Sequence, residues 1–156
     1  MNTDLAGGCG CGGLRYRLKA RPMIVHCCHC KDCQRQTGTA FVINAIIERD
    51  NIEIEQGSTV VCTMPTDSGR PHDLYRCRDC GTTVWSDYGR RKTMLFVRVG
   101  TLDEPSLLPP DVHIFTRSKL DWVGLPPGIP AFDIFYPSVE EFWPAEALSR
   151  RRALGF

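Results

Sequence analysis

The sequence predicts a mainly β fold, and three observations support this prediction. Glycine and proline, 14 and 11 of the 156 residues, recur along the whole chain. The apolar residues between them come in short runs rich in β-branched and aromatic side chains, which is typical of strands. Convincing helical periodicity is scarce. We therefore expect a mainly β domain built from many short strands.

The first predicted strand, GLRYRLK at 13–19, alternates strictly and places Leu14, Tyr16 and Leu18 on one face. The other predicted strands share a high content of β-branched and aromatic residues. They are FVINAII (41–47), IEIE (52–55), TVVCT (59–63), TVWSDY (83–88), MLFVRVG (94–100) and DVHIFT (111–116).

Two short helices are predicted. One runs from Asp32 to Thr37 and ends at Gly38, which is suited to the left-handed C-terminal cap of a helix. The other begins after Ser138, where Ser138 and Glu141 have the spacing of a capping box. Pro144 is expected to interrupt this second helix or to restart it, because proline cannot donate the backbone hydrogen bond.

The composition indicates one globular domain over residues 1–156, with 42% hydrophobic and 24% charged residues. The formal charge of +1 shows no large excess of Lys and Arg of the kind that binds nucleic acid, so no nucleic-acid partner is expected. No apolar run approaches the roughly 20 residues that span a bilayer, so no membrane partner is expected. The first residues, MNTDLAGG, lack the features of a signal peptide, and a cytoplasmic location is the expectation.

Nine cysteines in a chain of this length indicate metal binding. A secreted disulfide framework predicts an even number of cysteines and an export signal, and the sequence shows neither. In a reducing compartment, clustered cysteines bind metal more often than they form disulfides.

Cys9-Gly-Cys11-Gly precedes the first predicted strand, and Cys77-Arg-Asp-Cys80-Gly lies between two later ones. Each motif offers two sulfurs, whereas a tetrahedral site needs four donors. Together the motifs supply the four thiolates of a closed structural zinc site. The alternative for the first motif is a glycine-rich turn with exposed cysteines.

Cys28, Cys30 and Cys33 offer three thiolates from one tight loop, CHCKDC. A zinc ion held by three ligands keeps a fourth position open, as catalytic zinc sites do. The alternative is a closed site whose fourth ligand is Cys27, His29, Cys62 or a histidine elsewhere, and spacing does not decide between them. A redox CxxC at Cys30 and Cys33 is a further alternative, although the extra sulfur of Cys28 favours metal.

The remaining candidates have structural interpretations. His113 lies in a strand-like HIF and is read as a packed, hydrogen-bonded histidine, while His29 is read as steadying the loop or facing a substrate. Cys62 is interpreted as a small buried hydrophobe. Trp85 and Trp122 are expected in the core or in a pocket wall.

The order of these motifs resembles the glutathione-dependent formaldehyde-activating enzyme and centromere protein V family. The resemblance rests on G-x-C-x-C-G before a strand, CHCxxC, CxxCG, GTLDEP (100–105), HIF (113–115), Trp122 and Pro130-Ala-Phe132. It covers about 8–132 and leaves a C-terminal extension, 133–156. One departure is Gln34-Arg35, where the family usually has two arginines.

The resemblance implies a β-tent fold with two Zn²⁺ ions per chain. Cys9, Cys11, Cys77 and Cys80 would hold the structural zinc, and Cys28, Cys30 and Cys33 the second, catalytic zinc. It also implies a carbon–sulfur lyase, which forms or cleaves an S-hydroxymethyl adduct of glutathione or a similar thiol with a small aldehyde. The alternatives are a non-catalytic zinc-stabilised binding module and a thiol or metal sensor. An open metal position in a pocket would favour the enzyme.

Overall fold

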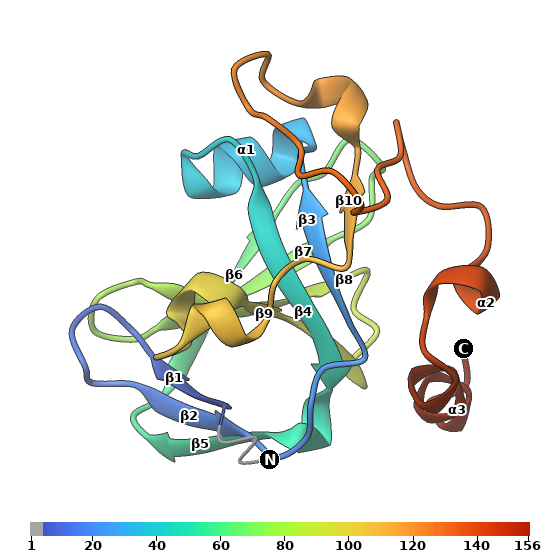
Figure 1. The fold of residues 1–156 in the computed structure, drawn as a ribbon. Coiled ribbons are helices and arrows are strands. Elements are labelled where there is room, and N and C mark those ends of the chain that lie inside the picture. The colour runs from blue at the N-terminus through green and yellow to red at the C-terminus, as the bar shows by residue number, and fades with distance from the viewer. Residues whose placement is uncertain (1–4) are drawn as a thin grey trace.

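The computed structural model describes residues 5–156, and two antiparallel-rich sheets form its body (Figure 1). The smaller sheet has the order β1-β2-β5 and is antiparallel throughout. Its strands are β1 (Leu5–Gly8), β2 (Arg15–Leu18) and β5 (Ile52–Gln56). The alternation predicted around β2 is confirmed, because Leu14, Tyr16 and Leu18 are all fully buried.

The larger sheet has seven strands in the order β10-β3-β4-β9-β8-β7-β6. Its strands are β3 (Ile24–Cys28), β4 (Val42–Glu48), β6 (Thr59–Met64), β7 (His72–Cys77), β8 (Thr83–Tyr88), β9 (Met94–Arg98) and β10 (Val112–Ile114). All neighbours pair antiparallel except β10 and β3, which are parallel. This parallel pair places His113 directly beside Cys27.

Helices are few and short, as predicted. Helix α1 (Lys31–Thr37) follows β3 closely and ends at Gly38, whose φ of 66° is the left-handed cap conformation. Near the C-terminus, α2 (Val139–Phe142) and α3 (Ala145–Ala153) are separated at Pro144. The predicted capping box is wrong: Ser138 does not cap α2, and its hydroxyl donates to Glu140. Single 3-10 turns cover Arg49–Asn51, Val99–Thr101, Pro105–Leu107 and Thr116–Ser118.

The larger sheet has an apolar core on each face. One core lies between the two sheets, where Tyr16 of β2 meets Trp85 of β8 edge-on at 5.3 Å between ring centroids. The other lies on the opposite face and includes Tyr136 and Trp143 from the C-terminal segment. Strand β4 contributes Ala45 and Ile47 to the first core and Ile46 to the second, as strand alternation requires.

The C-terminal segment is attached to the sheet by a partly buried ion pair. Arg150 of α3 donates two hydrogen bonds to the Glu48 carboxylate at the end of β4, and a third to the carbonyl oxygen of Arg21. The bidentate geometry fixes orientation as well as distance. Helix α3 is thereby held beside the second core, at the lower right of Figure 1.

The predicted fold class, mainly β with the short-stranded sheets of a β-tent, is confirmed. Every predicted strand region contains a strand, although β9 is shorter than predicted because a 3-10 turn begins at Val99. Three strands, β1, β3 and β7, were not predicted. Two burial predictions are also wrong: Trp122 is 77% exposed, and Cys62 in β6 is half-buried.

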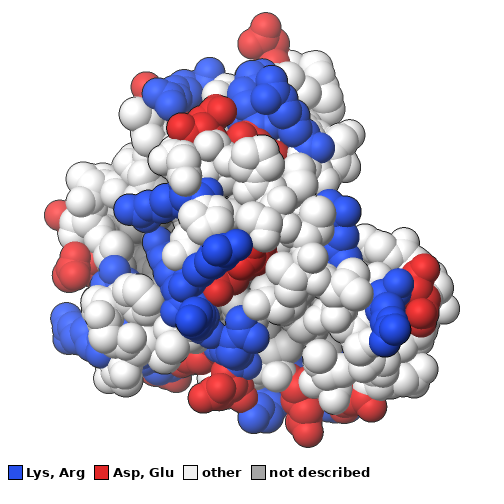
Figure 2. All heavy atoms as spheres, turned by 180° about the vertical axis from the view of Figure 1, so that it is seen from behind, with Lys and Arg blue, Asp and Glu red and all other residues white. Residues whose placement is uncertain are grey.

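The surface carries charges of both signs. On the face shown in Figure 2, Lys and Arg side chains lie interspersed with Asp and Glu and with large uncharged areas. Among residues 5–156, no helix combines the length and the apolar character needed to cross a membrane.

Candidate metal centres and the adjoining cavity

Two distant turns bring the first group of cysteines together. Cys9 and Cys11 lie in the turn between β1 and β2, and Cys77 and Cys80 lie where β7 turns into β8. The four sulfurs all lie within 4.8 Å of one another. The Cys9–Cys11 and Cys11–Cys77 sulfur distances are 3.4 and 4.0 Å. These values bracket the separation of about 3.8 Å between thiolates that surround a tetrahedral metal with bonds of about 2.3 Å.

Polar groups around this first group suit negatively charged sulfur. The backbone N–H of Leu14 donates to Cys9, and that of Gly13 donates to Cys11. Hydrogen bonding to the Thr82 hydroxyl, and then to the Thr82 backbone, lowers the pKa of Cys80 to about 5. The same hydroxyl oxygen accepts from Gly10, so Thr82 links both motifs. Such donors stabilise thiolates at metal centres.

The second group lies at the junction of β3 and α1. Cys28 is the last residue of β3, Cys30 caps the N-terminus of α1, and Cys33 lies in its first turn. Their sulfurs also lie within 4.8 Å of one another. The Cys30 sulfur accepts from the backbone N–H of Cys33 at 3.2 Å. Hydrogen bonds from Cys28 and Cys33 lower the pKa of Cys30 to about 3, which favours the thiolate form that a metal ion binds.

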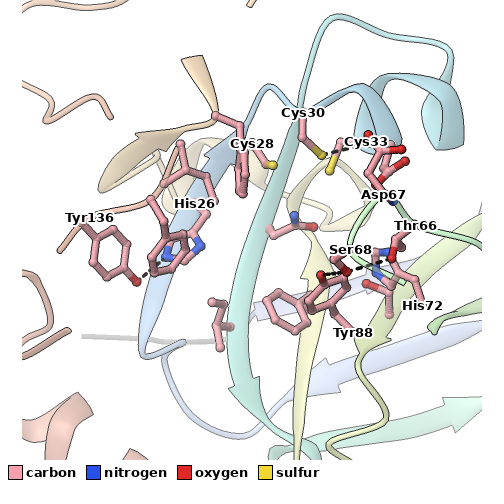
Figure 3. A pocket seen from close by; sticks show the side chains of 18 of the residues that line it. His26, Cys28, Cys30, Cys33, Thr66, Asp67, Ser68, His72, Tyr88 and Tyr136 are labelled. Atoms are coloured by element: carbon pink, nitrogen blue, oxygen red, sulfur yellow. Dashed lines mark hydrogen bonds between the residues drawn. The ribbon is translucent and has the colours of Figure 1, made fainter. Parts of the chain in front are cut away.

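These three sulfurs face a cavity of about 540 Å³ (Figure 3). Figure 3 shows them at one end of it, above His26, His72 and Tyr136. Its floor is apolar and comes from β4 and β9, with Ile46, Met94 and Phe96 among the lining residues. Aromatic residues of the C-terminal segment form another wall. A cavity of this size is typical of small-molecule sites.

A buried arginine lies beside the second group. Arg98, at the end of β9, is 6% exposed and is near enough to Cys33, Cys28 and Cys30 to interact electrostatically with all three. Its guanidinium donates to Asn44 and to Gln36, and the Gln36 amide is 3.0 Å from the His72 ring. Three thiolates around a divalent cation would leave one negative charge, and Arg98 would balance it. Sequence analysis did not identify Arg98, because this residue lies inside the predicted strand at 94–100 and belongs to no recognised motif.

Cys27 and His29 are directed away from the cavity. Cys27 and Cys28 are consecutive in β3, so their side chains point to opposite faces of the sheet. The Cys27 sulfur lies 3.6 Å from Nε2 of His29. That nitrogen lies 3.0 Å from Nδ1 of His113 on β10. All three side chains are at least 95% buried and form a polar chain between β3 and β10. The prediction that His113 is packed and hydrogen-bonded is therefore confirmed, and His29 contacts it in the buried interior.

Comparison with known proteins identifies the family of this chain. The family model described as glutathione-dependent formaldehyde-activating enzyme matches residues 4–118. The chain belongs to this family. A putative glutathione-dependent formaldehyde-activating enzyme of Halomonas elongata is 24% identical over 126 residues, which cover 78% of this chain and 80% of the relative.

A solved structure of a Rhodobacter sphaeroides protein aligns with 64% of this chain and 88% of its own, at 18% identity and a TM-score of 0.49.

Both cysteine groups lie inside the segment matched by the glutathione-dependent formaldehyde-activating enzyme family, whereas the aromatic wall of the cavity lies beyond it.

Each cysteine group contains a donor set that can hold a metal ion. The assignment of Cys9, Cys11, Cys77 and Cys80 to one metal and of Cys28, Cys30 and Cys33 to another stays a prediction. The fit is chemical: in each group, clustered sulfurs receive backbone hydrogen bonds. Cys27 and His29 form, together with the buried His113, a third group whose ligand atoms lie within 4.8 Å of one another, and Cys62 belongs to none of the three groups.

His72 gives a pH-dependent prediction. Burial, and then the Arg98 cation, lowers the pKa of His72 from 6.5 to about 4. Between these values the unfolded chain binds one more proton, so the stabilisation from neutral His72 is complete above pH 6.5 and is lost as the pH falls towards 4. In His72→Gln we expect the slope of unfolding free energy against pH to decrease by up to about 1.4 kcal/mol per pH unit in this window. Urea unfolding of both proteins measures it, and equal slopes would contradict the assignment.

Proposed function

We propose that this chain is a zinc-dependent carbon–sulfur lyase, which forms or cleaves the S-hydroxymethyl adduct of a thiol with a small aldehyde. Glutathione is the proposed thiol, in keeping with the family. The proposal assigns a structural zinc to Cys9, Cys11, Cys77 and Cys80. It assigns a second zinc, with one open position, to Cys28, Cys30 and Cys33.

The observation that carries this proposal is the difference in setting between the two cysteine groups. The group of three faces the cavity, whereas none of the four sulfurs of the other group lines it. Four protein thiolates complete a tetrahedral site, and three leave room for one further ligand. A metal held by Cys28, Cys30 and Cys33 would therefore be open towards the space that a substrate can enter.

The bound zinc would supply Lewis acidity and lower the pKa of an incoming thiol. The residues of the chain supply the surroundings. Arg98 places a buried positive charge beside the sulfurs and offsets the charge of an incoming thiolate. The Ser86 hydroxyl is fully buried, lines the cavity and has no protein partner, so it is free to hydrogen-bond a polar atom of the ligand. The apolar floor, which includes Ile46, Met94 and Phe96, offers no hydrogen-bond partner from these three side chains.

Metal analysis tests the cofactor assignment. Freshly prepared reduced protein, purified without chelator, is expected to contain about two zinc ions per chain, because seven clustered thiolates can complete one four-sulfur site and one three-sulfur site. Elemental analysis by mass spectrometry gives the number. One ion or none would contradict the two-site assignment.

Exchange spectroscopy tests the activity. In a mixture of glutathione and formaldehyde at equilibrium, catalytic amounts of metal-replete protein are expected to accelerate the exchange between free aldehyde and S-hydroxymethylglutathione. NMR magnetisation transfer measures the exchange rate directly. Protein from which the zinc has been removed by chelation is the control, and an exchange rate equal to that of the uncatalysed mixture would overturn the proposed activity.

A further inference from the structure

The cavity is larger and more apolar than formaldehyde requires, and much of its wall belongs to the C-terminal segment. Phe135, Tyr136, Val139, Trp143 and Arg151 all line it. All five lie beyond residue 118, where the match to the family model ends. This chain therefore encloses the sulfur-lined end of the cavity with residues outside the matched family segment.

The aromatic wall is held in place by hydrogen bonds. The Trp143 indole donates to the Tyr136 hydroxyl at 2.7 Å, and this hydroxyl is also 2.9 Å from Nε2 of His26 on β3. The Phe135 ring lies against Tyr136 at 4.0 Å between centroids. Across the cavity lie Ile46 and Met94, both nearly fully buried in the sheet. The apolar surface that stays open to the cavity belongs to its less buried lining residues, Phe96, Phe115 and Phe135, and it suits an apolar body such as a phenyl ring.

Two arginines line the same cavity without a carboxylate partner. Arg91 and Arg151 both stack on Phe156, with guanidinium carbons 5.7 and 6.0 Å from the ring centroid. Neither Arg91 nor Arg151 forms an ion pair within 4.0 Å among residues 5–156. Arginine is the residue best suited to bind a carboxylate, because its planar guanidinium can donate two parallel hydrogen bonds.

Two acids that interact electrostatically with these arginines, Asp87 and Glu140, have other partners. The Asp87 carboxylate accepts from the backbone N–H groups of Arg91 and Lys92. Glu140 of α2, whose pKa is lowered by hydrogen bonds and also by the charges of Arg151 and Arg152, accepts from the Ser138 hydroxyl. Burial, and then the charges of Arg70 and Arg151, lowers the pKa of Arg91, which indicates an excess of positive charge at this end. Helix α3, which carries Arg151, is well separated from α1 along the sheet in Figure 1.

We propose that the carbonyl partner of this enzyme is an acid-bearing aldehyde with an apolar, aryl-sized body. Its carboxylate lies at Arg91 and Arg151, its body lies against Phe96 and Phe135, and its carbonyl lies at the cysteine-lined end. This inference rests on the proposed function for the chemistry at that end. There the thiol sulfur bonds to the carbonyl carbon and the thiol proton passes to the carbonyl oxygen, giving a hemithioacetal without oxidation or reduction.

The test uses inert and reactive ligands of one shape on the full-length, metal-replete protein. The inert probe is 3-(4-methylphenyl)propanoate, which cannot react, with its methyl ester as the uncharged match. We expect the acid to bind at least about tenfold more tightly than the ester, because hydrogen bonds to charged groups contribute more than neutral ones. Calorimetry measures both affinities. Equal affinities, or no binding of either probe, would overturn the inference.

Variants locate the binding site. Arg151→Gln and Arg91→Gln are expected to weaken acid binding about tenfold and to leave ester binding unchanged. Arg152→Gln is the matched control, because Arg152 is exposed on the same helix and does not line the cavity. Phe135→Ala, at a half-exposed position that folding tolerates, is expected to weaken both probes. An Arg152→Gln effect as large as that of Arg151→Gln would place the acid elsewhere and overturn the inference.

The reactive probe, 3-(4-formylphenyl)propanoate, separates this inference from the proposed function. With glutathione present, hemithioacetal exchange is expected to be accelerated at least about tenfold more for this aldehyde than for formaldehyde at equal concentration. If the inert acid binds and no aldehyde exchanges, the proposed chemistry fails while the ligand class stands. If formaldehyde exchanges faster and the inert acid does not bind, the chemistry stands and the ligand class is wrong.

Discussion

Replacing Cys80 with serine is expected to lower the melting temperature by on the order of 10 °C and to remove one metal ion per chain. The first cysteine group joins the β1–β2 turn of the smaller sheet to the β7–β8 turn of the larger one. A metal held there connects segments separated by more than 60 residues. Serine keeps the shape of the side chain and loses the soft thiolate that zinc favours.

Thermal unfolding combined with elemental analysis measures both effects of Cys80→Ser. Cys62→Ser is the matched control, because Cys62 is a half-buried cysteine that belongs to neither metal-binding group. It is expected to melt close to wild type with full metal content. A soluble Cys80→Ser protein with unchanged melting and undiminished zinc would show that the four sulfurs do not form a structural site.

Replacing Cys30 with alanine is expected to abolish thiol binding while leaving most of the fold intact. Cys28, Cys30 and Cys33 come from one short segment, so closing it adds less stability than connecting two distant turns. Some stability is lost, because the Cys30 sulfur also caps α1, and a lost cap costs about 1 kcal/mol. Glutathione calorimetry and thermal melting of Cys30→Ala measure the two effects.

The variant Cys30→Ser separates the effect of losing the helix cap from the effect of losing the metal ligand. Serine is a good N-terminal cap, so this variant is expected to melt nearer to wild type than Cys30→Ala and still to bind no glutathione. Unfolding as severe as in Cys80→Ser would mean that the second metal is structural. Wild-type affinity for glutathione in Cys30→Ala would disprove the open-site mechanism.

Local sequence patterns correctly predicted several strands and the end of a helix. Strict alternation identified the strand containing Tyr16, and glycine at position 38 marked the end of α1. Strand β3 was missed because IVHCC is buried on both faces and shows no alternation. Strand β7, HDLYRC, was missed because polar residues dominate it. The three cysteines of the loop could be proposed as a group because they are close in sequence.

The rest of the site depends on contacts between distant residues. Arg98 reaches the second cysteine group because β9 pairs with β4, and this pairing leaves no local signal in the sequence. Tyr136 meets His26 only once the C-terminal segment has folded back across the sheet. The separation of Cys27 from Cys28 follows from strand alternation, and it would have been predictable had β3 been recognised.

If the proposed zinc assignment holds, the unequal spacing of the two cysteine groups would set an order of metal acquisition during protein synthesis. In the proposed assignment, the ligands of the second zinc are complete once residue 33 has left the ribosome. The four-sulfur site must wait until Cys80 emerges, and until then Cys9 and Cys11 are a pair of reactive thiols without their partners. A cell short of zinc would therefore produce chains in which the catalytic site had first access to the metal, while the connection between the sheets was still missing.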